Sequence, residues 1–277
     1  PWVRRDLGGL SPYARLMRVV AEVDEVLYEV IEARRSDPMT GLRDDVLSLL
    51  LRATHEDGSG LRASEIRDEL LTMIMAGYET TTSALAWAFE RLLRTPRAMM
   101  RLRGELEAGE DAYLDAVIKE TLRARTVVPI VARRLRESAE IAGHLIPAGT
   151  ILMVSVYLLH NDPDTYPEPE RFRPERFLDG VPEGAAWIPF GGGVRRCLGA
   201  SFAQLEMKVV LREVMTSVGL RVVSEAPEEP KRKRFTLGPA SGATAIVEDA
   251  PRPKRPVPSR RFAPAEPQAT LGAGGNG

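Results

Sequence analysis

The stretch "PFGGGVRRCLGA", from Pro189 to Ala200, contains the only cysteine in the 277-residue chain. Cys197 comes just before a segment with helical spacing, so amide groups at the positive end of that helix can approach its sulfur. Together with Arg195 and Arg196 they favour the thiolate, the form in which cysteine binds metal. Four glycines accompany the thiol, and without Cβ atoms they let the backbone approach a bulky flat molecule closely: Gly191, Gly192, Gly193 and Gly199.

Two other interpretations of this stretch are weaker. A phosphate-binding loop would need a Gly-Lys-Ser/Thr or G-x-G-x-x-G pattern after a strand, and the sequence has neither pattern and no clear preceding strand. A cysteine packed as a small hydrophobic residue is the ordinary state of a cytosolic cysteine. The glycines and arginines around Cys197 argue against that state here.

The composition is that of a globular protein, with 44% hydrophobic and 28% charged residues. The 38 basic and 39 acidic residues leave a net charge of -1, so the chain as a whole has no electrostatic attraction to nucleic acid or to an anionic membrane. A single cysteine forms no intrachain disulfide, and zinc-type ligand patterns are absent from the sequence. We therefore expect a cytoplasmic protein without a nucleic-acid partner.

The longest segment without Asp, Glu, Lys or Arg runs from Ile141 to Asn161. Its length raises the question of a membrane span. However, "GHLIPAGT" within it is typical of a turn between two short strands, so we expect no span in this chain. The chain begins at Pro1 rather than at methionine, so a preceding signal or anchor can be missing from it.

Apolar periodicity and capping signals predict a mostly helical domain. Short strands are expected after Arg125, around Phe235 and around Ile246, and the proline-rich segment from Asn161 to Phe177 is expected to be an ordered meander. The chain from Ala250 onward has almost no apolar periodicity, which predicts a disordered tail. Six helices are predicted. The first starts at a Ser11 cap with Pro12 at its first position, the third runs from a Ser64 cap to Arg94, and the fourth starts at Pro96. The second, fifth and sixth span Asp44 to Thr54, Asp111 to Arg125 and Ala200 to Gly219.

A second motif lies inside the longest predicted helix. The sequence "AGYETT", Ala76 to Thr81, places Gly77 and three consecutive threonines, Thr80 to Thr82, in a helix interior. Glycine costs about 1 kcal/mol relative to alanine there, and β-branched residues add smaller penalties. Either tertiary packing tolerates these poor helix formers, or the positions serve a function.

The cysteine loop matches the pattern F-x-x-G-x-R-x-C-x-G and resembles the heme-binding loop of the cytochrome P-450 superfamily. The match rests on Phe190, Gly193, Arg195, Cys197 and Gly199. The resemblance implies heme b, iron protoporphyrin IX, with an axial thiolate from Cys197 and with Arg195 paired to a heme propionate. Arg196 is expected to face solvent. A Cys-x-x-Cys-His pattern is absent from the sequence, so covalent c-type attachment is excluded.

The "AGYETT" segment resembles the A/G-G-x-D/E-T motif of the family's oxygen-binding helix, where a widened turn faces the heme. The resemblance implies that Thr80 hydrogen-bonds bound oxygen and that Glu79 helps to relay protons from solvent. Ala76 and Gly77 would leave room for dioxygen.

Glu120 and Arg123 resemble the family's E-x-x-R pair. The spacing alone means little, because Glu32/Arg35, Glu168/Arg171, Glu170/Arg173 and Glu229/Arg232 repeat it. The pair gains weight from "PERF" at Pro174 to Phe177, which follows before the cysteine loop. The resemblance implies a structural, buried ion-paired core formed by Glu120, Arg123 and Arg176.

The segment "VPIVARRL" resembles the strand whose arginine contacts a heme propionate. Arg133 is the preferred candidate and Arg134 its close rival. Ile130 and Val131 either line the substrate pocket or are plain core residues.

These motifs occur in family order between about Ser11 and Val247. The predicted fold class is therefore mainly α with minor β, the C-terminal two-thirds of the cytochrome P-450 fold. Residues 1–248 would be the C-terminal portion of that domain, with its N-terminal part missing, and 249–277 a disordered Pro/Arg/Gly-rich tail.

The resemblance implies a bacterial-type soluble heme-thiolate monooxygenase that inserts one oxygen atom from O2 into a small apolar organic substrate. The sequence has no flavin or iron–sulfur motif, so a ferredoxin or flavin reductase would supply electrons. The alternative is a truncated heme-binding remnant without monooxygenase activity.

Overall fold

The computed structural model describes residues 11–181 and 186–248, and the predicted tail at 249–277 lies outside the described residues. Within these ranges the protein is mainly helical with small sheets. The α-helices are α1 (Pro12–Arg35), α2 (Val46–Arg52), α3 (Ala63–Leu93), α4 (Pro96–Ala108), α5 (Ala112–Ala124), α6 (Val156–His160) and α7 (Ala200–Ser217). Short 3-10 helices span Thr40–Leu42, Pro174–Phe177 and Gly193–Arg195.

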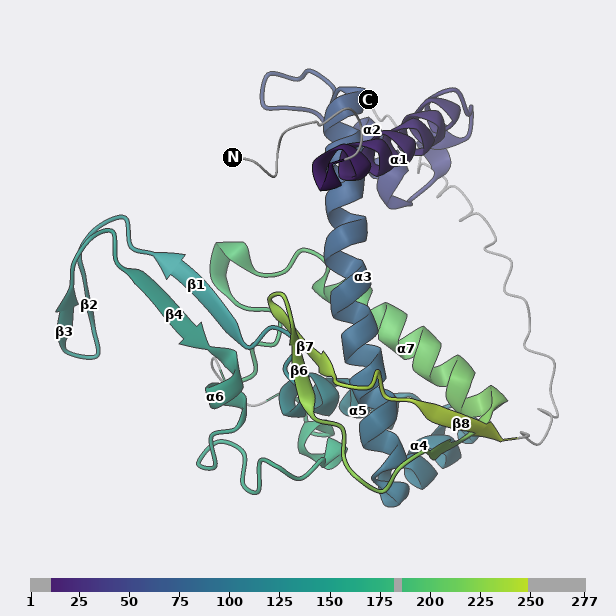
Figure 1. Ribbon diagram of the computed structural model, residues 1–277, viewed down its shortest axis with the longest axis vertical. Helices are drawn as coiled ribbons and strands as arrows, with labels where there is room; N and C mark the ends of the chain where they lie inside the picture. Colours follow the sequence, from purple (N-terminus) through teal and green to yellow (C-terminus); the bar gives the residue numbers. More distant parts are fainter. Residues whose placement is uncertain (1–10, 182–185, 249–277) are drawn as a thin grey trace, which may run out of the picture.

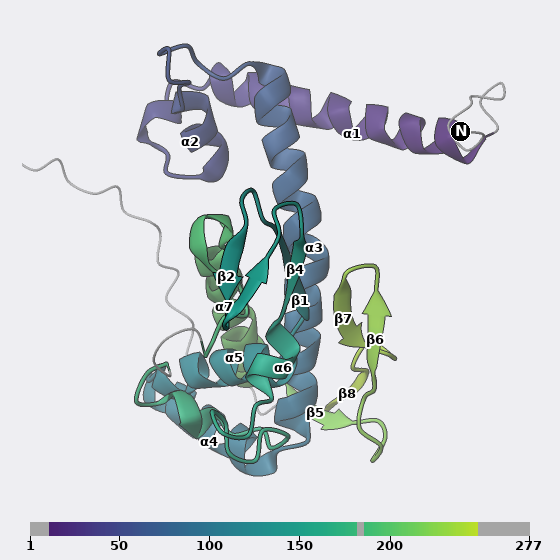
Figure 2. The same ribbon diagram turned by 90° about the vertical axis from the view of Figure 1, so that its left-hand side faces the viewer.

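Helix α3 is the axis of the fold (Figure 1). Near its N-terminal end lie α1 and α2, and α1 crosses α3 in the turned view (Figure 2). Helices α4, α5 and α7 pack around its C-terminal half. The helix that carries the "AGYETT" motif is therefore in contact with most of the other helices.

Two of the expected helix boundaries rest on clear local signals. Ser11 caps α1, because its Oγ accepts the Ala14 N–H at 3.0 Å, and Pro12 follows at the first helical position. Pro96 starts α4 directly after α3 has ended. Both sequence predictions are confirmed.

The predicted Ser64 cap of α3 is wrong. The helix starts at Ala63 with Arg62 as its N-cap, and the backbone N–H of Arg62 donates to Oε2 of Glu65 at 2.7 Å. The guanidinium of Arg62 also pairs with Glu65 at 3.0 Å. A carboxylate in the first turn thus satisfies the exposed amide and favours an earlier start than the serine alone indicates.

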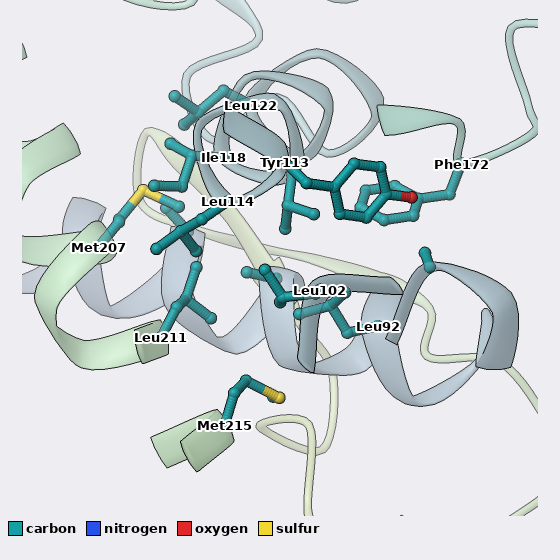
Figure 3. Close-up of a cluster of buried hydrophobic side chains, with 14 of the residues drawn as sticks. Leu92, Leu102, Tyr113, Leu114, Ile118, Leu122, Phe172, Met207, Leu211 and Met215 are labelled. Carbon is teal, nitrogen blue, oxygen red and sulfur yellow. The ribbon is translucent and has the colours of Figure 1, made fainter. Parts of the chain in front are cut away.

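The main core lies between the C-terminal half of α3 and helices α4, α5 and α7 (Figure 3). Leu92, Leu102, Leu114 and Leu211 are fully buried where these four helices meet. A second, smaller core joins α1, α2 and α3 through Ile31, Leu47 and Ile66. The two cores fix the ends of α3 separately, while its middle, around Ile74 to Tyr78, stays exposed.

The strands form four separate two-stranded antiparallel sheets. In the pair nearest the cysteine loop, Val131 is opposite Val154 and Arg133 is opposite Leu152. Strand β5 and the separate strand β6 were not predicted from the sequence. The strands are β1 (Ile130–Arg134) with β4 (Ile151–Ser155), β2 (Ala139–Ile141) with β3 (His144–Ile146), β5 (Gly219–Val222) with β8 (Ala245–Glu248), and β6 (Pro230–Lys233) with β7 (Thr236–Pro239).

The charge-free segment from Ile141 to Asn161 forms β3, a turn, β4 and α6, in agreement with the turn expected from its sequence. In the part of the chain that the structure describes, no helix combines the length and the apolar character needed to cross a membrane.

Candidate functional site

The cysteine loop folds back on itself before α7. The Cys197 N–H donates to the carbonyl of Phe190 at 2.9 Å, and the Arg196 N–H donates to the carbonyl of Gly193 at 3.0 Å. Gly191 and Gly193 have φ angles of +69° and +65°, which side chains with a Cβ rarely adopt. The glycines therefore permit a tight loop that carries Cys197 on its surface.

The thiol and its surroundings are exposed. Cys197 is a free, exposed cysteine, and the neighbouring Val194 and Leu198 have 103% and 89% of their surface accessible. Phe202, on the first turn of α7, is 66% exposed. Arg195 and Arg196 are also exposed. A sulfur donor, an apolar surface and guanidinium groups thus occur together on one loop.

Strand β1 lies beside this loop. A guanidinium N–H of Arg133 donates to the carbonyl of Gly192 at 3.4 Å, and a Cβ on Gly191 would be 3.9 Å from Cγ1 of Val131. Arg134 follows on the strand and so lies on its opposite face. Of the two arginines that the sequence left open, Arg133 is the one that reaches the cysteine loop.

The "AGYETT" motif lies on the exposed middle of α3. Ala76 and Gly77 are exposed, and a Cβ added to Gly77 would meet nothing within 4 Å. The expected widened turn is not present, because α3 is α-helical throughout. Instead Thr80 satisfies its hydroxyl locally by donating to the carbonyl of Ala76 at 2.7 Å.

Glu79 is held from outside its own helix. Its Oε1 accepts a hydrogen bond from the hydroxyl of Thr236 on β7, and Thr236 is fully buried. A further hydrogen bond ties the same strand to α3, because Trp87 Nε1 donates to the carbonyl of Leu237 at 3.2 Å. Gly238 lies so close to α3 that an added Cβ would be 3.2 Å from Oγ of Ser83. Sequence reasoning missed Thr236, because no local pattern indicates that β7 reaches α3.

The E-x-x-R pair is completely buried. Arg123 donates through Nε and Nη2 to the two carboxylate oxygens of Glu120 at 2.7 and 2.8 Å. It also donates to the carbonyls of His160 and Pro169, each at 2.8 Å. All its bonds therefore go to protein groups, as a buried charge requires.

Arg176 from the "PERF" segment completes this cluster. Its Nε lies 3.6 Å from Oε1 of Glu120, and its Nη2 donates to the carbonyl of Glu168 at 2.8 Å. The Arg173 N–H donates to Oε1 of Glu120 at 2.9 Å. The structure thus brings Glu120, Arg123 and Arg176 together, with one carboxylate between two guanidinium groups.

His160 is a buried polar residue that sequence reasoning did not single out. Its side chain is inaccessible, its Nε2 accepts the Ile188 N–H at 3.0 Å, and its Nδ1 is 3.2 Å from Oγ1 of Thr126. Burial, and next the positive charge of Arg123, lower the pKa of His160 to about 4. The imidazole is therefore neutral at physiological pH.

The comparisons with known proteins agree on one family. The family model described as "Cytochrome P450", written here cytochrome P-450, matches residues 8–244. The chain belongs to the cytochrome P-450 family.

Two curated relatives from Mycobacterium tuberculosis illustrate the similarity. Cytochrome P-450 138 is 42% identical over 248 residues, which cover 89% of this chain and 56% of the relative. Cytochrome P-450 135B1 is 43% identical over 241 residues, 85% of this chain and 51% of the relative. The chain thus spans about half the length of the curated relatives it matches.

Solved structures show the same fold over a similar share of their own length and of this chain. The cyanobacterial protein CYP120A1, solved with retinoic acid bound, superposes with a TM-score of 0.77 at 28% identity, covering 87% of this chain and 59% of that one. The cytochrome P-450 CYP102L1 gives a TM-score of 0.76 at 26% identity, covering 87% and 58%. The chain therefore has part of the cytochrome P-450 fold.

Members of this family hold heme through a cysteine thiolate. The chemistry of the cysteine loop fits such a group: a thiol as iron ligand, exposed apolar side chains for a flat macrocycle and exposed arginines for its carboxylates. The described residues contain no cluster of three or more His, Cys, Asp or Glu side chains that could hold a metal ion.

Proposed function

We propose that this chain is the C-terminal part of a heme-thiolate monooxygenase and that Cys197 supplies the axial iron ligand. The observation that carries the proposal is the exposed thiol on a glycine loop with positive φ angles at Gly191 and Gly193. Family membership supports it, because thiolate-ligated heme is the cofactor of the family. Residues 1–248 would then be part of one catalytic domain.

The remaining residues of the loop would hold the cofactor. Arg195 and Arg133 are exposed guanidinium groups on the loop and on the adjacent strand, suited to pair with the two propionates. Gly193 and Gly199 keep Cβ atoms away from the macrocycle, and Phe190 holds the loop closed through its carbonyl.

When bound, the heme activates dioxygen with two electrons, so that one oxygen atom enters a C–H or C=C bond of the substrate and the other leaves as water. The reduction consumes two protons, which this chain must deliver. Glu79, with Oε1 held by Thr236, would take a proton on Oε2 and pass it through water toward Oγ1 of Thr80. Ala76 and Gly77 would leave space for the oxygen molecule beside the helix.

The partners follow from that chemistry. A small apolar organic substrate would contact apolar residues near the loop, among them the exposed Ile130 and the partly buried Val131 of β1. A ferredoxin or flavin reductase would deliver the electrons, and the cytoplasm would be the compartment. The alternative is that the chain binds heme without turnover.

The deciding experiment is a spectrum of the heme-loaded chain after reduction and addition of carbon monoxide. A strongly red-shifted Soret band is expected from thiolate ligation by Cys197, and the Cys197→Ala variant should lose it. A band that persists in this variant excludes the assignment. If the band is present but a panel of apolar substrates is not oxidised with peroxide, heme binding without turnover is favoured.

A further inference from the structure

We propose that His160 is a positioning residue that fixes the start of the cysteine loop to the buried Glu120–Arg123 pair. The inference deepens the proposed function, because it says what holds the loop that presents Cys197. Its test, however, does not require heme.

His160 lies at the junction of three segments. Its carbonyl accepts a hydrogen bond from Arg123 Nη1 at 2.8 Å, so its backbone is bound to the ion pair. Its imidazole contacts Thr126, directly after α5, through Nδ1, and Ile188, before the cysteine loop, through Nε2. A single residue therefore connects α5, α6 and the loop.

The hydrogen-bond directions are consistent with a neutral imidazole. Because Nε2 accepts from the Ile188 N–H, the ring proton resides on Nδ1 and is donated to Oγ1 of Thr126. The Thr126 hydroxyl then donates onward to the carbonyl of Arg123 at 3.2 Å. Every polar atom of this buried side chain has a partner, so the ring has one fixed orientation.

Backbone hydrogen bonds connect Ile188 to Cys197. The carbonyl of Ile188 accepts the Gly191 N–H at 2.9 Å, and the carbonyl of Phe190 accepts the Cys197 N–H at 2.9 Å. The contact at Ile188 is thus followed by two backbone bonds that shape the loop up to the thiol. Residues Gly192 to Gly199 are exposed, whereas Ile188 to Gly191 are partly buried, so the loop depends on its partly buried start.

A second anchor lies next to this one. Trp187 Nε1 donates to the carbonyl of Lys119 at 3.2 Å, and the ring of Trp187 contacts Phe190 edge-on with centroids 6.4 Å apart. This anchor holds the loop start to α5 by its indole, whereas His160 controls the Ile188 amide itself. Loss of His160 alone should therefore loosen the loop without detaching it.

The test is amide hydrogen exchange on the full chain without heme, followed over residues 188–197, with residues 113–122 of α5 as internal reference. In His160→Ala the hydrogen-bonded amides of Ile188, Gly191 and Cys197 should exchange about tenfold faster, the factor for one lost bond of about 1.4 kcal/mol. His144→Ala, at an exposed position on β3, is the matched control and should leave exchange unchanged. Unchanged loop exchange in His160→Ala, or an equal increase in α5, overturns the proposal.

A pair of conservative variants keeps the test valid if the alanine variant does not fold. Gln at position 160 places its amide near the Nε2 position and can still accept from Ile188, whereas Asn places its amide near the Nδ1 position and cannot reach it. We expect slow loop exchange in His160→Gln and fast exchange in His160→Asn. Equal exchange in the two variants contradicts the inference.

Heme binding then separates this inference from the proposed function. In heme-loaded His160→Asn, a smaller fraction of the reduced carbon monoxide complex should show the red-shifted band than in His160→Gln. A chain that never binds heme defeats the proposed function and leaves the exchange result standing. Heme binding with normal thiolate ligation and equal loop exchange in both variants defeats the His160 inference alone.

Discussion

Thr236 on β7 donates its hydroxyl hydrogen to the carboxylate of Glu79 on α3, across 157 positions of sequence. The threonine is completely buried, and the glutamate belongs to the motif that the proposed function assigns to proton delivery. The β6–β7 hairpin therefore holds one side of this carboxylate in place.

The first prediction concerns this contact. Thr236→Val keeps the shape of the side chain and removes its hydroxyl, so it should lower the free energy of unfolding by about 1.5–3 kcal/mol, as expected for a hydrogen bond to a charged group. Thr236→Ser retains the hydroxyl and should lose less. Urea unfolding of both variants and of the unaltered chain measures the difference, and a midpoint of Thr236→Val equal to that of the unaltered chain would show that the hydroxyl contributes nothing.

The second prediction compares two ion pairs with the same i,i+3 spacing. Glu120→Ala leaves the inaccessible Arg123 guanidinium without its carboxylate and should cost about 3–5 kcal/mol. Glu32→Ala removes the exposed pair with Arg35 and should cost less than about 1 kcal/mol. Denaturant midpoints of the two variants test this contrast, which similar losses would contradict.

The third prediction is a pH dependence caused by His160. Its pKa is lowered from 6.5 to about 4 in the folded protein, so between these values the unfolded chain binds more protons at this residue. The free energy of unfolding should therefore rise with pH across this window, by at most about 1.4 kcal/mol per unit, and this contribution should be constant above it.

His160→Gln should remove that slope, and His144→Gln, at an exposed position, should keep it. The measurement is urea unfolding at a series of pH values between 4 and 7. An unaltered slope in His160→Gln would assign the dependence to other groups.

The fourth prediction distinguishes two glycines. Gly77→Ala should stabilise the chain by up to about 1 kcal/mol, because alanine favours the helix and a Cβ there meets nothing within 4 Å. Gly193→Ala should instead destabilise the cysteine loop, since the position has a φ of +65°. Thermal unfolding of both variants should show shifts in opposite directions.

Local sequence signals were sufficient for most helices. The Ser11–Pro12 start of α1 and the Pro96 start of α4 follow from capping and proline geometry, which depend on neighbouring residues only. The start of α3 was misjudged, because Arg62 and Glu65 compete with Ser64 for the same role. Strand β5 was missed, since a strand of four residues gains its stability from its partner β8, distant in sequence.

The candidate site could be predicted in part. The motif around Cys197 indicated heme ligation from sequence alone, and the motifs at Glu79 and Glu120 agreed with it. Which of Arg133 and Arg134 lies against the cysteine loop needed the structure, because adjacent residues of a strand occupy opposite faces. His160 and Thr236 had no sequence signal, because their importance lies in contacts with distant segments.

The sequence by itself indicated the family, the helical framework and the cysteine proposed as iron ligand, since these depend on residue types at fixed short spacings. Only the tertiary structure decided two other polar contacts: the Thr236 hydroxyl with the Glu79 carboxylate, and the His160 imidazole with the backbone N–H of Ile188. The physical reason is that a buried polar group must find its partner wherever the fold places one. That partner can be any number of residues away along the chain.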